Sequence, residues 1–405
     1  MNSSGRAAIL AISFAHFVVA TPMIYAILAL PLILASQGYG GDTIGLLQLV
    51  ALPAILKLLL AVPIEKIRLA GNQYKNWSLL LLGCYSLVLA IIATLSLKED
   101  LSTIVALLTL TALLATFVDI PLSALSIKQF NPCQHMQLAS FKAAALFIAS
   151  ITGGGLLLLC YSYYGWFMPL ALMSLLSFIA FIALTFITEV PDRLNKTAKL
   201  SASFTDITSF FAQAHSRLWI ILLLSYFSFI SAGWVYIKPL LLTKGFSTEQ
   251  LAISVGILGG FVGIFASLVG NKIAHGYGKG CLLKTAAIVN LTCFIYGAIL
   301  LTVEAASSYY YLLIILLASG LGLASAVMFA FIMQHSRPHC QAIDYSLQMT
   351  LMTLARILIA VLAGIIIKLS SYTGLFVFLS FAMLWVTYIS WLFANKVNVY
   401  AAKTR

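Results

Sequence analysis

The sequence predicts an all-α membrane protein with twelve transmembrane helices, and two observations carry that prediction. Only 8% of the 405 residues are charged and 62% are hydrophobic, whereas a soluble domain is roughly 25% charged because its surface faces water. The apolar residues also occur in runs of about twenty, the helix length that crosses a ~30 Å hydrocarbon layer. A membrane-spanning barrel would instead alternate polar and apolar residues over about ten positions, and the sequence has no such alternation.

Short polar segments separate the apolar runs from one another. Several prolines fall inside the runs, among them Pro22, Pro31, Pro53 and Pro121. Neighbouring helices in a membrane satisfy the carbonyl groups that such prolines free, so we expect kinks there and not helix ends. The predicted helices are 7–35, 43–63, 77–97, 101–127, 139–163, 165–188, 218–243, 248–270, 281–303, 309–334, 343–369 and 372–395.

The distribution of Lys and Arg predicts the orientation, because cytoplasmic loops of membrane proteins carry an excess of both. With the N-terminus inside, sixteen of these residues lie in inner segments and three, Lys98, Lys244 and Lys368, lie in outer ones. We therefore expect both termini in the cytoplasm and the chain in a bacterial inner membrane. The same rule accounts for the net charge of +12. The expected partners are the lipid bilayer and a small-molecule substrate, with no nucleic acid, and the expected state is a monomer.

The longest polar stretch, 189–217, lies near the middle of the chain. Within it, Phe204, Ile207, Phe210, Phe211 and Ala214 recur at helical spacing beside polar residues, which is typical of a short amphipathic helix on a membrane surface. A plain linker is the alternative. The predicted organisation is a six-helix bundle over 1–188, a cytoplasmic linker over 189–217 and a second six-helix bundle over 218–405.

Two short patterns recur in both halves at the same offset. Asp42 ends the sequence GYGGD before the second helix, and Glu249 ends GFSTE before the eighth, about 207 residues later; the same shift aligns the loops 65–71 and 272–278. Six plus six helices around a basic central loop is the pattern of major facilitator transporters, whose halves are related by an axis along the membrane normal. The sequence therefore predicts a 6+6 pseudo-symmetric major facilitator fold, in which a substrate binds near mid-bilayer and the halves expose it to each side in turn.

Ionisable residues inside the predicted spans are the first functional candidates, because a charge near the bilayer centre costs at least ~2.5–3.5 kcal/mol on insertion scales. Cations outnumber acids among them, and an electropositive cavity favours an anionic substrate. The candidates are His16, Lys57, Asp119, Lys142, Lys238, Asp344 and Arg356.

Arg356 lies ~20 Å from the cytoplasmic start of its helix at 1.5 Å per residue, close to the midplane. Because a guanidinium fork matches a carboxylate, we predict that Arg356 binds the anionic group of the substrate. The alternative is a buried structural pair with a nearby acid. Asp119 and His16 are the predicted proton-coupling residues, since histidine titrates near physiological pH. For Asp119 the alternative is an ion pair with Lys142, and for His16 it is packing.

The remaining charges lie nearer the helix ends. Lys57, Lys142 and Asp344 are expected to extend towards the interface or to form gating salt bridges, and we assign Gln348 to the same group. Lys238, towards the outer end of its helix, is expected to attract an anion entering from outside.

Four aromatic residues fall on helices expected to line the cavity. We predict that they stack on a large ligand, with plain packing as the alternative. They are Tyr25, Tyr226, Trp234 and Tyr236.

The sequence contains no GxxxxGK[ST], HExxH or GxSxG pattern, so we predict no enzymatic activity, no cofactor and no metal site. The run Gly153-Gly154-Gly155 lies in an apolar helix, where close helix packing is the better explanation.

Three stretches resemble known permease families. The stretch 43–67, which includes Lys57, resembles the signature of the AmpG-like muropeptide permeases and the related acetyl-CoA transporters. The stretch 119–124, DIPLSA, resembles their D-I-A-x-D-A motif, with Asp119 at the first acid and Ser123 at the second. In the eleventh helix, 344–348 reads DYSLQ and resembles the D-Y-T-L-Q pattern of the RhtX/FptX siderophore permeases, which are twelve-helix proteins near this length.

The resemblance to major facilitator transporters implies that helices one, four, seven and ten line a cavity. The resemblance to siderophore permeases implies that the chain imports an iron–siderophore complex into the cytoplasm, and we expect proton symport as the energy source. A muropeptide permease and an exporter of the same fold are the alternatives. A membrane-embedded acyl-transferring enzyme is a further alternative, but the sequence lacks a polar catalytic cluster.

Overall fold

The computed structural model describes residues 3–38, 53–190, 204–212, 216–303 and 305–403, and the regular structure in these ranges is helical. Ten helices among the described residues are long and apolar enough to cross a membrane. The tenth spans 55 residues, Gln341–Asn395, and breaks at Ser371, whose φ is 69°. It thus contains both helices predicted at 343–369 and 372–395. The predicted helix 43–63 lies partly outside the described residues; α4 (Lys57–Lys66) covers its last turns.

The chain forms two compact units, and each unit combines separate stretches of sequence. Unit 1 consists of Met1–Leu138, Ile148–Ile207 and Met333–Thr350. Unit 2 consists of Ala139–Phe147, Thr208–Ile332 and Leu351–Arg405. The division at 189–217 stays a prediction. The segment Met333–Thr350 comes from the second half of the sequence but shares a core with the first helices.

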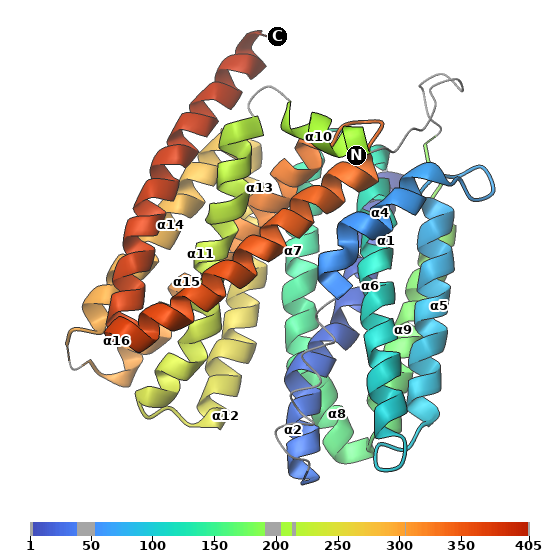
Figure 1. Cartoon of the computed structure of the whole chain (residues 1–405), viewed down its shortest axis with the longest axis horizontal. Helices are drawn as coiled ribbons and strands as arrows, with labels where there is room; N and C mark the ends of the chain where they lie inside the picture. The colour runs from blue at the N-terminus through green and yellow to red at the C-terminus, as the bar shows by residue number, and fades with distance from the viewer. Residues whose placement is uncertain (1–2, 39–52, 191–203, 213–215, 304, 404–405) are drawn as a thin grey trace. The chain divides into compact units, whose positions relative to one another are not determined.

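Unit 1 is built around a layer of long helices (Figure 1). The helix α5 packs against α6 and α9, and α1 packs against the same two helices. A buried cluster that includes Ile64, Ile120 and Ile343 joins α4, α6 and the start of α16. The elements are α1 (Ser3–Ile24), η1 (Tyr25–Ala29), α2 (Leu30–Ser36), α4, α5 (Lys75–Thr94), α6 (Leu101–Gln129), α7 (His135–Ile151), η3 (Thr152–Leu156), α8 (Leu157–Tyr164) and α9 (Phe167–Thr185).

Two π-helical turns occur in unit 1: η1 lies between α1 and α2, and η3 lies between α7 and α8. The two turns contact each other, and Gly153 lies at the contact. A Cβ at Gly153 would approach the backbone oxygen of Thr21 to 2.7 Å and the backbone nitrogen of Tyr25 to 3.1 Å. Only glycine lets the two backbones approach this closely.

Unit 2 has α15 as its most buried helix. A Cβ at Gly322 of α15 would lie 2.5 Å from the backbone oxygen of Gly263, so glycine again permits close packing. Part of α7, Ala139–Phe147, belongs to this unit. Its other elements are α11 (Ser216–Thr243), α12 (Thr248–Leu251), η4 (Ala252–Leu258), α13 (Gly259–Tyr277), α14 (Lys279–Leu300), α15 (Ser307–Gln334) up to Ile332, and α16 (Gln341–Lys403) from Leu351 onward.

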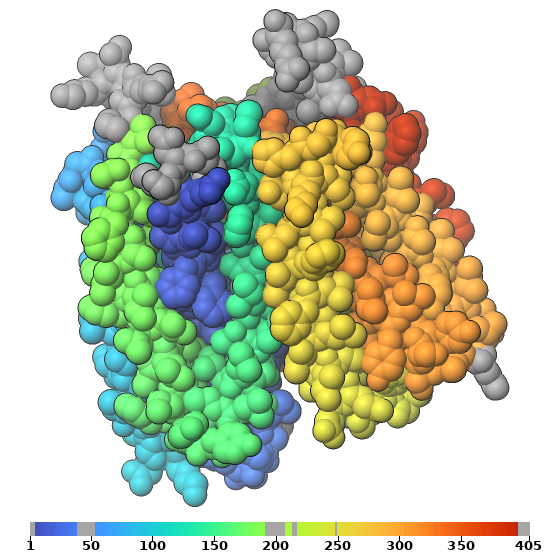
Figure 2. Space-filling model, turned by 180° about the vertical axis from the view of Figure 1, so that it is seen from behind, coloured from blue at the N-terminus to red at the C-terminus, as the bar shows by residue number. Residues whose placement is uncertain are grey.

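Large apolar side chains cover much of the surface of both units. Leu87 is 66% exposed, Phe265 71% and Phe381 70%. In Figure 2 the outer face of α13 is the yellow surface. Such a surface requires hydrocarbon as its solvent, so the chain is a multi-pass membrane protein.

A short helix, α10 (Phe204–Phe211), occupies part of the central polar stretch. It lies where the sequence predicts an amphipathic helix. Phe210 is buried, while Phe211 is exposed. Ala214 lies outside the described residues.

Candidate functional site

The carboxylate of Asp119 is the centre of an ionic cluster inside unit 1. Asp119 lies in the C-terminal half of α6, two residues before Pro121. Its Oδ1 is 3.1 Å from Nδ1 of His16 on α1, and its Oδ2 accepts a hydrogen bond from the ammonium group of Lys57 on α4. The side chains are 4%, 10% and 19% exposed for His16, Lys57 and Asp119. Three helices thus bring three predicted candidates together around one carboxylate.

Tyr345 of α16 completes this cluster. Its hydroxyl donates a hydrogen bond to Oδ2 of Asp119 at 3.3 Å, and the ammonium group of Lys57 lies 5.0 Å from the centre of its ring. Ser123, one turn after Asp119, donates to Oδ1 at 3.5 Å. Buried ions persist only when they are paired and hydrogen-bonded, and these contacts meet that requirement.

We call the cluster of His16, Lys57, Asp119 and Tyr345 the Asp119 cluster. Its net charge depends on how many protons it carries. A carboxylate with one ammonium group is neutral overall while the imidazole is neutral. Adding one proton to the imidazole or the carboxylate makes the cluster cationic.

Asp344 and Gln348 lie on the same segment as Tyr345 but bind other partners. Arg337 donates to both oxygens of Asp344, from Nε to Oδ2 at 2.8 Å and from Nη2 to Oδ1 at 2.7 Å. Gln348 donates to the hydroxyl of Ser336 at 3.3 Å. These contacts hold the turn at 333–341 against the start of α16.

Glu65, which lies beyond the predicted span 43–63, accepts the first free N–H groups of α16. Its Oε2 is 2.8 Å from the amide nitrogen of Ala342 and 3.3 Å from that of Ile343. Its Oε1 accepts from Tyr74 at 2.8 Å and from Gln73 at 3.1 Å. A helix N-terminus carries unpaired donors and a positive partial charge, so this buried carboxylate attaches the segment Met333–Thr350 to unit 1. Burial raises the pKa of Glu65 to about 7.

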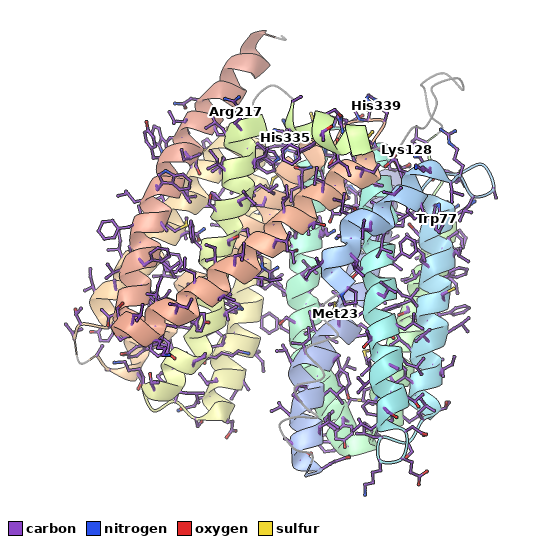
Figure 3. The ribbon with its side chains drawn as sticks, in the orientation of Figure 1. Met23, Trp77, Lys128, Arg217, His335 and His339 are labelled. Carbon is purple, nitrogen blue, oxygen red and sulfur yellow. The ribbon has the colours of Figure 1, made fainter. Side chains whose placement is uncertain are left out.

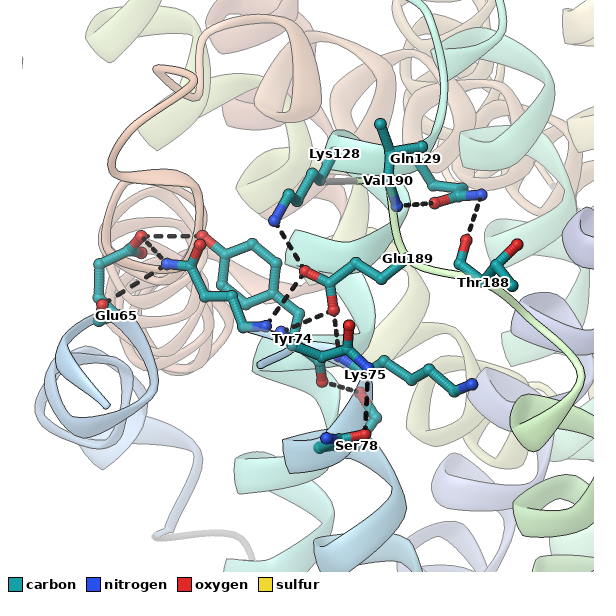
Figure 4. A network of polar contacts seen from close by, with 12 residues as sticks. Glu65, Tyr74, Lys75, Ser78, Lys128, Gln129, Thr188, Glu189 and Val190 are labelled. Atoms are coloured by element: carbon teal, nitrogen blue, oxygen red, sulfur yellow. Dashed lines mark hydrogen bonds and ion pairs between the residues drawn. The ribbon is translucent and has the colours of Figure 1, made fainter. Parts of the chain in front are cut away.

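A second glutamate, Glu189, caps another helix at the same end of unit 1 (Figure 4). Its carboxylate accepts from the backbone of Gln73, Tyr74 and Lys75 at 3.3, 3.1 and 2.8 Å, where α5 begins. Lys128 neutralises it at 2.8 Å. Figure 3 shows Lys128 and Trp77 near this end of the unit and Met23 nearer its middle. The start of the 189–217 stretch is thereby fixed to α5 and α6.

Three predicted cations lie in unit 2. The guanidinium group of Arg356 is 5.5 Å from the ring centre of Phe227, and among the described residues no carboxylate pairs with it. The ammonium group of Lys142 is 5.5 Å from the ring centre of Phe329, and Lys142 is 3% exposed. Lys238 is exposed.

Three of the predicted aromatic residues have partners within their own units. Tyr226 is fully buried and donates to the carbonyl oxygen of Leu283 at 2.8 Å; Tyr236 donates to that of Ala360 at 2.9 Å. Trp234 packs against Gly259. Tyr25 is 1% exposed, and its hydroxyl has no hydrogen-bond partner among the described residues.

Sequence reasoning missed the roles of Tyr345, Glu65 and Glu189. The pattern DYSLQ contains Tyr345, but no rule assigns a tyrosine inside an apolar helix to an ion on another helix. Glu65 and Glu189 border basic loops, where a solvated carboxylate is the ordinary expectation. No group of three or more His, Cys, Asp or Glu side chains within the described ranges could hold a metal ion.

The helical fold and the buried ions define a polytopic membrane protein of the transporter class. The chain belongs to the Major Facilitator Superfamily, whose sequence pattern matches residues 12–360. Members of this superfamily carry small molecules across membranes.

Solved structures with the same fold include the human organic anion transporter MFSD10 (TETRAN), with a TM-score of 0.76, 15% identity, and coverage of 96% of this chain and 100% of that one. The transporter FucP, in an outward conformation, has a TM-score of 0.73 and 12% identity, and the match covers 96% of this chain and 97% of that one. A bacterial homologue of the iron transporter ferroportin, in an outward-facing state, has a TM-score of 0.68 and 13% identity, and the match covers 96% of this chain and 99% of that one.

Proposed function

We propose that this protein is a proton-coupled secondary transporter that imports an anionic siderophore, with the Asp119 cluster as its proton-binding site. The observation that carries the proposal is the carboxylate of Asp119 shared between His16 on α1 and Lys57 on α4. One added proton gives this neutral cluster a positive charge in a medium that penalises charge. An anion that binds more tightly to the positively charged state would, by thermodynamic reciprocity, also promote proton binding.

Cations in unit 2 support an anionic substrate. Arg356 has an aromatic neighbour, Phe227, but no ion-pairing acid among the described residues. A guanidinium group without an internal carboxylate is suited to an external one. Siderophores commonly carry carboxylates or phenolates, and the motif DYSLQ at 344–348 resembles that of siderophore permeases.

One protein that shares the fold is described as an organic anion transporter, and another as a bacterial homologue of an iron transporter. These descriptions agree with the proposed cargo. We further propose a bacterial inner-membrane location with both termini in the cytoplasm, based on the sixteen-to-three distribution of Lys and Arg, and a monomeric state.

The test is uptake of labelled iron–siderophore complexes into membrane vesicles, with and without an imposed pH gradient. The wild-type protein is expected to accumulate one siderophore class only when the outside is more acidic. Asp119→Asn removes the proton-binding carboxylate, so gradient-driven accumulation should fall about fivefold or more, the lower range of coupling between sites. Exchange of internal for external substrate without a gradient should persist, because it needs no net proton movement.

Glu99→Gln is the matched control, because Glu99 is an exposed loop carboxylate. It should leave accumulation unchanged. Gradient-independent uptake by the wild-type protein would contradict proton coupling. Transport of muropeptides, or of no siderophore in either direction, would contradict the proposed cargo.

A further inference from the structure

The helix α14 and the last part of α16 form an antiparallel seam in unit 2 (Figure 1). At one end, Nζ of Lys284 donates to Oδ1 of Asn395 at 2.8 Å. Further along, the hydroxyl of Thr387 donates to the carbonyl oxygen of Met383 on its own helix at 2.7 Å and lies 3.5 Å from that of Ala287. Both contacts place α14 beside the last part of α16.

The apolar end of the seam contains a groove of about 260 Å³. Leu291, Ile295 and Ala298 line it from α14, and Val377, Phe381 and Leu384 line it from α16. Its polar member, Ser380, donates its hydroxyl to the carbonyl oxygen of Phe376 at 2.8 Å. The groove therefore offers hydrocarbon contact and no free side-chain hydroxyl, which suits an acyl chain.

The charged end of the seam holds a cation without an acidic partner. The ammonium group of Lys284 lies 4.3 Å from the ring centre of Trp391. Asn395 takes one of its three N–H donors, and in the part of the chain that the structure describes no carboxylate takes another. The site thus has a positive charge and two free donors beside an amphipathic ring, a combination found where lipid headgroups bind.

The two ends belong to one continuous surface. On α14, Lys284, Ile288, Leu291 and Ile295 follow each other at intervals of three or four residues and so share a helix face. On α16, Trp391, Tyr388, Leu384, Phe381 and Val377 do the same. Ile288 and Tyr388, between the charged and apolar ends, are 47% and 63% exposed, so the apolar stripe is uninterrupted.

The spacing along this stripe matches half a bilayer. From Lys284 to Leu291 and Ile295 is ~10 and ~17 Å of helix at 1.5 Å per residue. One leaflet of a ~30 Å hydrocarbon core is ~15 Å deep. A chain whose headgroup sits at Lys284 would therefore end in the groove.

We propose that the α14–α16 seam is a binding site for one anionic phospholipid, with its phosphate at Lys284 and an acyl chain in the groove lined by Leu291 and Phe381. This site is independent of the Asp119 cluster.

The test is native mass spectrometry of the full-length protein after extraction, with added phosphatidylglycerol or phosphatidylethanolamine, together with thermal stability on adding back each lipid. We expect the wild-type protein to retain phosphatidylglycerol in preference to phosphatidylethanolamine. Lys284→Gln should lower phosphatidylglycerol retention about fivefold, the size expected for one Lys at an anionic membrane surface. Lys284→Arg should preserve retention because it keeps the charge, and it also serves if the Gln variant does not fold.

Filling the groove provides an independent arm. Ala298→Phe should lower retention of both lipids while leaving Lys284 in place. Lys368→Gln is the control, because Lys368 is an exposed cation of α16 away from the seam. Equal retention of the two lipids by the wild-type protein, unchanged retention in Lys284→Gln, or equal stabilisation by inorganic phosphate alone would overturn the proposal.

Discussion

The hydroxyl of Tyr345 hydrogen-bonds the carboxylate of Asp119, a residue that precedes it by 226 positions in the sequence. Tyr345 belongs to the segment Met333–Thr350, which is part of unit 1. The residue proposed to bind the proton therefore contacts the segment of the second half that joins unit 1. If Asp119 takes up the proton as proposed, it loses the negative charge that this hydroxyl and Lys57 both contact, and we expect the attachment of the segment to weaken.

Tyr345→Phe should alter the pH dependence of transport more than it alters substrate affinity. The ring that faces Lys57 remains, but Asp119 loses a donor to its charged form, an interaction of about 1.5–3 kcal/mol. Proton-driven uptake should therefore persist to a higher external pH than in the wild-type protein. The measurement is initial uptake rate against pH, with Tyr163→Phe as control because Tyr163 is 80% exposed. An unchanged pH profile would exclude a positioning role for Tyr345.

Glu65 should make thermal stability depend on pH. Its pKa is about 7 in the folded protein against an ordinary 4.5, so folding favours the protonated form. This contribution is fully present below pH 4.5 and is lost as pH rises through 7, and it amounts to on the order of 3 kcal/mol. The apparent Tm should therefore fall between pH 5 and 8.

Glu65→Gln should flatten that fall, because the amide does not titrate in this range. The measurement is apparent Tm against pH for the wild-type protein, Glu65→Gln and the control Glu99→Gln. If Glu65→Gln has the same slope as the wild-type protein, another group is responsible for the pH dependence.

Arg356→Ala should raise the KM for the anionic substrate about tenfold or more, since a charge-assisted hydrogen bond contributes about 1.5–3 kcal/mol. The KM of Arg356→Lys should lie between those of the wild-type protein and Arg356→Ala, because an ammonium group keeps the charge but lacks the planar fork. Initial uptake rates over a range of substrate concentrations measure both effects. Full activity in Arg356→Ala would show that Arg356 does not bind the substrate, whereas Lys368→Ala should be without effect.

Gly153→Ala should destabilise the protein by about 1–3 kcal/mol, the usual cost of an overpacked contact. The new Cβ would lie 2.7 Å from the backbone oxygen of Thr21, whereas at Gly155, in the same π-helical turn, a Cβ would meet nothing within 4 Å. Gly155→Ala is therefore the matched control. Thermal unfolding of both variants in the same detergent distinguishes them, and equal Tm values would mean that the η1–η3 contact tolerates a methyl group.

The sequence predicted the fold class well because the bilayer imposes it. Runs of about twenty apolar residues must be helices when no water is present to hydrogen-bond the backbone. The presence of the helices therefore followed from the length of these runs. Local backbone choices were less predictable. The π-helical turns at Tyr25–Ala29 and Thr152–Leu156 depend on contact between two helices that are distant in sequence.

The ionic cluster was predictable in its members and not in its pairing. The free-energy cost of placing an ionisable group in hydrocarbon identifies His16, Lys57 and Asp119 as functional candidates. Their spacing along separate helices does not show which of them are in contact. The sequence suggested Lys142 as the ion-pair partner of Asp119, whereas the contacts described above are with Lys57 and His16. Glu65 and Glu189 escaped prediction because their partners are backbone N–H groups, which carry no residue identity.

The break at Ser371 leaves essentially no loop between the last two helices. Because no flexible loop joins them, neither helix can shift along the membrane normal without displacing the other. We therefore expect the two helices to move together. Residues inserted at this corner would therefore uncouple the movements of the two helices.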